Sequence, residues 1–272
     1  MRSKTEPGEL LRVVDAPDGT IEEAALIIAR DAHPSLSLPA QLARLDELAT
    51  PISDALRLAR PKAQAAILGD ALYGEGRLQG NRADYHDPRN SYLDEVLTRG
   101  LGIPISLAVV LLAVCRRADV EAQGIGFPGH FLVRLGGSGG AYVDPFDQAR
   151  VLDRTAIAHL ARKHLGDDAK LRAEHLEPAS KRTMTIRILA NLRAIHRLRG
   201  HHPGVLVVCD RLVELDAGPG AVRDRGLAAL SLGAVAAARS DLERYLGEVP
   251  DAPDRTSVES ALSRARKKSS WN

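Results

Sequence analysis

The stretch Gly100–Leu135, GLGIPISLAVVLLAVCRRADVEAQGIGFPGHFLVRL, decides how the chain is interpreted. Pro104 suits the first turn of a helix, where a missing N–H costs nothing. The residues from Ile105 to Arg117 are apolar almost all round, which predicts a helix buried on every side. Gly100 and Gly102 separate this helix from the one before it.

After this helix the pattern of apolar residues changes from a helical period to the two-residue period of strands. Strands are predicted at residues 122–126 and 130–135, the second with alternating side chains. A Gly-Gly-Ser-Gly-Gly turn, residues 136–140, leads into a third strand at 141–144. A buried helix followed by a small antiparallel sheet predicts an α+β fold.

Helices also dominate the residues before this stretch. They are predicted from Ile21 onward and at about 40–48, 53–60 and 63–73, with prolines between them. The segment 80–90 is rich in Asn, Asp, Gly and Pro, which is typical of a loop. A short helix is then predicted at residues 92–98, with Ser91 or Asn90 as its cap.

The last third of the chain is predicted to be helical, with weak internal repetition. Helices at 188–199 and 205–215 form one unit, and helices at 222–232 and 234–246 form the next. Gly200 and Gly233 stand 33 residues apart, a period that suits paired-helix repeats. A final amphipathic helix is expected at 256–268. We therefore predict two domains, residues 1–179 and 180–272.

Composition excludes some classes of function. The 37 basic and 35 acidic residues give a net charge of +2, and no recognisable DNA-binding motif occurs, so direct nucleic-acid binding is not expected. The polar start, Met1–Leu11, has no apolar segment, and the longest apolar run, Ile103–Val114, is too short to span a bilayer. Two cysteines make no disulfide framework. A soluble, cytoplasmic protein without membrane association is expected.

Three residues could together do chemistry: Ser106, His130 and Asp144. Ser106 lies in the first turn of the buried helix, where backbone N–H groups favour an anion. His130 follows a Phe-Pro-Gly turn, and Asp144 ends the next strand. If these strands form a hairpin, the carboxylate can orient the imidazole, and the imidazole can activate a nucleophile.

The blocks that carry these residues resemble the transglutaminase-like core, a papain-like fold. More closely they resemble bacterial SirB/SirC-type regulators, which join that core to tetratricopeptide repeats. The similarity spans about residues 20–250. The matching segments are Ala25–Ala29, Asp87–Leu93, Gly102–Ala108, Gly126–Phe131, Tyr142–Phe146, Arg223–Leu227, Ser240–Leu242 and Tyr245–Leu246.

The resemblance implies an α+β fold with N-terminal helices, a small antiparallel sheet and an all-α tetratricopeptide-like tail. In catalytic members of the superfamily a cysteine begins the central helix and pairs with a histidine and an aspartate. The matching positions here are Ser106, His130 and Asp144. A serine hydroxyl is far less nucleophilic than a thiolate and depends fully on a base. The resemblance therefore supports the fold better than transglutaminase activity.

Each candidate also has a structural interpretation. Ser106 could bond helix N–H groups, and His130 with Asp144 could hold two strands together. Asn90 and Arg89 are binding candidates that could instead fix the loop over the cleft. Cys115 lies nine residues after Ser106 on the predicted helix, half a turn off, and is expected to be a core thiol.

Neither a metal nor an organic cofactor is expected. His159 and His164 are five residues apart, off a shared helix face, and His201-His202 has no third ligand near in sequence. No Gly-x-Gly-x-x-Gly motif occurs, and the Gly136–Gly140 segment is a hairpin turn rather than a phosphate cradle.

Two functions remain. The first is a catalytically degenerate protein that binds or regulates a protein or peptide through its helical repeats. The alternative is a serine-dependent amide or ester hydrolase or acyl transferase. There Ser106 attacks, His130 acts as base and then acid, and Asp144 orients His130.

Overall fold

A computed structural model describes residues 8–74, 76–168 and 170–269. Most of the polar start for which no signal peptide is predicted, residues 1–7, therefore lies outside the described residues. The chain divides into two compact units: Arg12–Ile188, here called the core unit, and the residues from Leu189 onward together with the described part of Met1–Leu11, here called the repeat unit. The predicted domain boundary at 179/180 stays a prediction, because helix α9 begins at Lys181 and continues across the division.

The N-terminal helices form where the sequence predicts them. Thr20 caps α2 through a capping box in which Thr20 Oγ1 accepts the Glu23 backbone N–H and Glu23 accepts that of Thr20. The buried Glu22 binds Arg116 and Arg117 of the central helix. The helices are α1 (Glu9–Asp15), α2 (Ile21–Ala32), α3 (Leu38–Ala49), α4 (Ser53–Leu58) and α5 (Pro61–Leu72), with a 3₁₀ turn, η1 (Thr50–Ile52), before α4.

The central helix α7 (Pro104–Arg117) is buried along almost its whole length, as its apolar sequence predicts. Before it, α6 (Leu93–Arg99) ends at Gly100, whose φ of 72° places it in the left-handed region. The predicted caps for α6 are wrong. Tyr92 is the N-cap residue and makes no side-chain cap bond. Asn90 does not cap the helix because its side chain is bonded within the preceding loop.

Four antiparallel strands form one sheet in the order β3-β4-β5-β6: β3 (Ala122–Ile125), β4 (Leu132–Leu135), β5 (Ala141–Asp144) and β6 (Arg150–Leu152). Strand β4 starts two residues later than predicted. His130 instead lies in a turn in which its N–H binds the Phe127 carbonyl at 3.0 Å and Gly129 has a φ of 68°. Strand β6 was not predicted, since three residues that follow a 3₁₀ turn, η3 (Pro145–Asp147), carry no period.

The loop before α6 also contains regular structure that the sequence did not reveal. A two-stranded parallel sheet pairs β1 (Gln79–Gly80) with β2 (Leu101–Gly102), and a 3₁₀ turn, η2 (Pro88–Asn90), precedes α6. The pairing fixes the start of α7 beside the loop 80–90, since β2 ends two residues before α7 begins.

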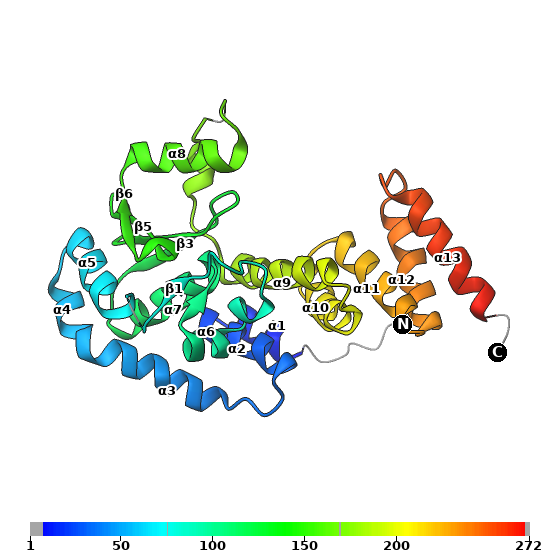
Figure 1. Cartoon of the computed structure of the whole chain (residues 1–272), viewed down its shortest axis with the longest axis horizontal. Helices are drawn as coiled ribbons and strands as arrows, with labels where there is room; N and C mark the ends of the chain where they lie inside the picture. The colour runs from blue at the N-terminus through cyan, green and yellow to red at the C-terminus, as the bar shows by residue number, and fades with distance from the viewer. Residues whose placement is uncertain (1–7, 75, 169, 270–272) are drawn as a thin grey trace. The chain divides into compact units, whose positions relative to one another are not determined.

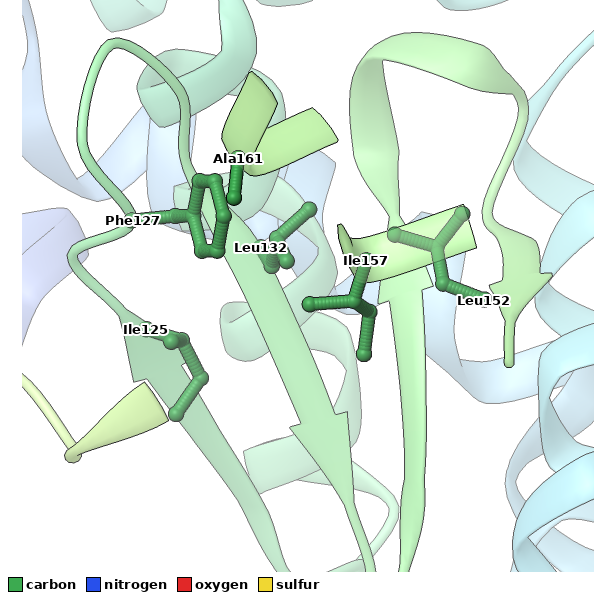
Figure 2. Packing of buried hydrophobic residues seen from close by; sticks show 6 residues of the cluster. All are labelled: Ile125, Phe127, Leu132, Leu152, Ile157 and Ala161. Carbon is green, nitrogen blue, oxygen red and sulfur yellow. The ribbon is translucent and has the colours of Figure 1, made fainter. Parts of the chain in front are cut away.

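Both faces of the four-stranded sheet are covered. Helix α7 packs against β3 and β4. Helix α8 (Arg154–Leu165) lies over the other face (Figure 1). Figure 2 shows how it is attached, with Ile157 and Ala161 packed among side chains from the strands and the loop after β3. This cluster contains Ile125, Phe127, Leu132, Leu152, Ile157 and Ala161. Burial on both faces agrees with β4, in which Leu132, Val133 and Leu135 are all buried and only Arg134 is partly exposed.

The repeat unit is helical throughout its described residues. Gly200 and Gly233, which are 33 positions apart, have φ values of 64° and 82° and form equivalent turns between helices. Consecutive helices pack against each other from α10 to α13. The helices are α9 (Lys181–Leu198), α10 (His202–Glu214), α11 (Pro219–Ser231), α12 (Val235–Glu248) and α13 (Arg255–Ser269). Helix α9 begins seven residues before the predicted start. No described helix is long and apolar enough to cross a bilayer.

Candidate functional site

The structure brings His130 and Asp144 together. His130 lies in the turn before β4 and Asp144 ends β5, so the hairpin register places the two side chains at the same sheet end. His130 Nε2 lies 2.9 Å from Asp144 Oδ1, and both side chains are buried. The same oxygen accepts the backbone N–H of Phe146 at 2.9 Å, so the carboxylate is held on two sides. A carboxylate fixed in this way orients the imidazole.

Aromatic rings surround His130. The His164 ring from α8 stacks on it with centroids 5.7 Å apart, and the Phe146 ring meets it edge-on at 6.1 Å. Burial lowers the pKa of His164, and the adjacent His130 and Lys163 lower it further, while Asp144 opposes them. The surroundings of His164 therefore favour its neutral form.

A cavity of about 910 Å³ opens beside this pair. Its floor includes His130, Asp144 and Phe146, and α8 forms one wall with His159 and His164. Both α8 histidines therefore face one space, although their five-residue spacing did not predict a shared face. The volume lies at the upper end of that of ordinary ligand sites. The core unit thus retains a hollow large enough for a peptide side chain or a small molecule.

Ser106 does not line this cavity. Its hydroxyl is buried, donates to the Asn90 carbonyl at 2.6 Å and accepts the Ile103 N–H at 3.0 Å. Within the described chain no hydrogen bond joins Ser106 to His130. The residue from the start of α7 that does line the cavity is Pro104. A serine nucleophile requires its base within hydrogen-bond reach, and this geometry favours the structural interpretation of Ser106 over the catalytic one.

Asn90 and Arg89 are bonded within their own loop. The Asn90 amide donates to the Asp84 carbonyl at 2.7 Å and accepts from Asn81 at 3.0 Å, and the residue is fully buried. Arg89 Nη2 lies 2.7 Å from the buried Asp87, and its side chain is otherwise exposed. Neither residue lines the cavity. Their contacts support a role in fixing the loop onto the start of α7.

Sequence reasoning missed Tyr73 as well as the cavity residues of α8. The Tyr73 hydroxyl is buried and makes no hydrogen bond within the described residues. Burial raises its pKa, and the nearby Asp144 and Cys115 raise it further. Only the tertiary structure brings Tyr73 near Asp144, because its own sequence neighbourhood carries no signal. The same holds for Pro104, which reads only as a good helix start.

Both cysteines lie in the core, which confirms the prediction for Cys115. Cys115 and Cys209 are fully buried, and burial raises the pKa of each thiol to about 12. A thiol with this pKa is almost entirely protonated at pH 7 and is a poor nucleophile. Neither cysteine replaces the missing nucleophile of the candidate site.

One group of possible metal ligands occurs among the described residues, outside the cavity. It contains His33, Asp94 and Glu95, whose ligand atoms lie within 4.8 Å of one another. His33 Nδ1 lies 2.6 Å from Asp94 Oδ2, a hydrogen bond that accounts for their approach without an ion. The sequence prediction of no metal stays a prediction.

Comparison with known proteins identifies the family. A profile described as transglutaminase-like superfamily matches residues 40–190, and a tetratricopeptide repeat profile matches residues 192–263. The chain belongs to the transglutaminase-like superfamily. It is 39% identical to a UPF0162 protein of Xylella fastidiosa over 88% of each chain. It is 34% identical to a UPF0162 protein of Pseudomonas aeruginosa over 82% of this chain and 83% of that one.

A shorter similarity reaches a eukaryotic protein. Over 77 residues the chain is 42% identical to F-box only protein 21 of Homo sapiens, which is 28% of this chain and 12% of that one. No solved structure matches the chain. The transglutaminase-like fold and the repeat tail expected from the sequence are therefore both confirmed by the family matches.

Proposed function

We propose that this protein is a catalytically degenerate, cytoplasmic member of the superfamily that binds a protein or peptide partner through its helical repeats. One observation supports the absence of catalysis in this proposal: the Ser106 hydroxyl donates a hydrogen bond to the Asn90 carbonyl. The cavity beside the His130–Asp144 pair receives Pro104 from the start of α7, and proline offers no nucleophile. The SirB/SirC-type regulators that the sequence resembles are the proposed subfamily.

The repeat tail supports the second half. Paired-helix repeats cannot each bury a core alone, and stacked pairs present extended surfaces that suit peptide segments. A helical repeat region joined to a core that has no usable nucleophile favours binding of a partner over catalysis. In this proposal the His130–Asp144 pair is a structural bond between two strand ends, and its cavity is a secondary contact site.

The bonded His130–Asp144 pair keeps one alternative open. It is a serine-dependent hydrolase or acyl transferase, because a His–Asp pair beside a cavity supplies two of the three members of a catalytic triad. For this alternative the Ser106 side chain has to leave the Asn90 carbonyl and approach His130. That movement gives up two buried hydrogen bonds.

A fluorophosphonate probe separates the two functions. The purified protein is incubated with the probe and its intact mass is measured, with Ser106→Ala, His130→Ala and Ser91→Ala as variants. Ser91 is a matched control, since it is also a buried serine near the start of a helix in the core unit. We expect no adduct. One adduct that the Ser106→Ala and His130→Ala variants lose, and that Ser91→Ala keeps, would establish the hydrolase instead.

Peptide binding is tested separately by panning a random peptide library on the full chain. The proposal expects families of related sequences to be enriched over successive rounds. A library that shows no enrichment on the full chain, while a known peptide-binding protein enriches its own ligand, contradicts the binding function.

A further inference from the structure

Three arginines of the repeat unit converge on one buried aspartate. Asp224 of α11 has a side chain that is 1% exposed. Arg223 binds its Oδ1 atom through Nε at 2.8 Å. Arg197 Nη1 lies 3.1 Å and Arg193 Nε lies 3.7 Å from its Oδ2 atom, which makes no well-aligned hydrogen bond within the described chain. These three residues of α9 and α11 are here called the arginine triad.

The triad carries more positive charge than its acidic partners neutralise. Among the described residues, Asp224 and Asp254 are the carboxylates that pair with it, and Asp254 also accepts the Tyr245 hydroxyl at 2.7 Å. Three guanidinium groups against two carboxylates leave an excess of one positive charge. Guanidinium groups held around a single carboxylate repel one another, and a further anion relieves that repulsion.

The triad also keeps hydrogen-bond donors for a ligand. The side chains of Arg193 and Arg197 are 26% and 52% exposed, and among the described residues each forms an ion pair with Asp224 alone. A guanidinium has five N–H donors, so most of theirs remain free to bind. Arg225, also on α11, differs from Arg193 and Arg197 because two carboxylates, Asp241 and Asp210, already bind its guanidinium group.

A helix N-terminus lies beside the triad. Helix α11 starts at Gly218-Pro219-Gly220 without a side-chain cap; Pro219 has no N–H, and the Ala221 N–H donates to the Gly218 carbonyl at 3.2 Å. Arg193 Nη1 lies 3.8 Å from the place where a Cβ on Gly220 would be, so the Arg193 side chain lies against the start of α11. The helix dipole at this end adds to the attraction that the arginines exert on a carboxylate.

We propose that the arginine triad is a binding site for a carboxylate side chain in an acidic segment of the protein partner. The proposal rests on the proposed function, in which the repeat unit binds a peptide. Planar guanidinium groups bind carboxylates through two parallel N–H···O hydrogen bonds, and this bidentate geometry gives specificity as well as attraction. An acidic segment is the occupant that complements the local charge excess.

The test uses fluorescence anisotropy with the full chain. The probe is a fluorescein-labelled octa-glutamate peptide with an amidated C-terminus, and octa-glutamine is the uncharged control. The variants are Arg193→Ala with Arg197→Ala and, as a matched control, Arg239→Ala with Arg244→Ala on α12. Each pair removes two positive charges, so net charge changes equally. Arg197→Ala alone is added, because its side chain is half exposed and its loss leaves Asp224 bound to Arg223.

The triad double variant is expected to bind octa-glutamate roughly tenfold more weakly than the wild type, which is the loss of one good charged contact. The Arg197→Ala variant is expected to bind severalfold more weakly, and the α12 variant to change little. Equal weakening in both double variants, or no binding of octa-glutamate by the wild type, overturns the proposal. Enrichment of peptides without acidic residues in library panning would overturn it while leaving the proposed function intact.

Discussion

Replacing Ser106 by alanine tests whether its hydroxyl is a structural group. The substitution leaves the Ile103 N–H and the Asn90 carbonyl without their partner, and both residues are fully buried. An unsatisfied buried polar group costs about 1–3 kcal/mol. Two such groups lower the free energy of unfolding by about 2–6 kcal/mol. For a unit of this size each kcal/mol shifts Tm by about 2–4 °C, so a fall of about 4–24 °C is expected.

Differential scanning calorimetry measures this change, and Ser91 provides the control. The Ser91 hydroxyl is also buried but makes no hydrogen bond within the described chain, so Ser91→Ala removes an unsatisfied group and should leave Tm equal or raise it. A Ser106→Ala protein that melts like the wild type would refute the structural interpretation. Equal destabilisation by the two substitutions would also refute it, because burial alone would then explain the effect.

Three further predictions follow from burial and backbone geometry. Burial and the charges of His201 and Arg199 lower the pKa of His196 to about 4, so its neutral form stabilises the fold above pH 6.5. Roughly 2–3 kcal/mol of unfolding free energy should be lost as the pH falls from 6.5 to 4, and urea titrations of His196→Gln should show a flatter profile. A maleimide should label Cys115 and Cys209 only after denaturation, and rapid labelling of the native protein would contradict their burial. Gly129→Ala should lower the unfolding free energy by about 1–3 kcal/mol, since φ is 68° and the new Cβ would lie 2.6 Å from the His164 ring; unchanged chemical denaturation would contradict this.

Local sequence was sufficient to predict the secondary structure where a single hydrophobic period or a single turn determines it. The apolar run of α7 has no polar face and so becomes a helix buried among the N-terminal helices and the sheet. The glycine-rich turn after β4 forces a hairpin, and that hairpin brings His130 to Asp144. Gly200 and Gly233 each end a helix in the left-handed region, so their spacing alone indicated the repeat.

Tertiary structure alone decided which side chains share the cavity. Helical spacing places Ser106 near the start of α7, but only the position of the loop 80–90 brings the Asn90 carbonyl to its hydroxyl. His164 is 34 positions from His130 in sequence and meets it because α8 packs over the sheet. Contacts between distant segments depend on how faces pack, and neither residue type nor period encodes that packing. The sequence by itself therefore determined the family and the candidate residues, while the packing of α7, α8 and the loop decided which of them face the cavity.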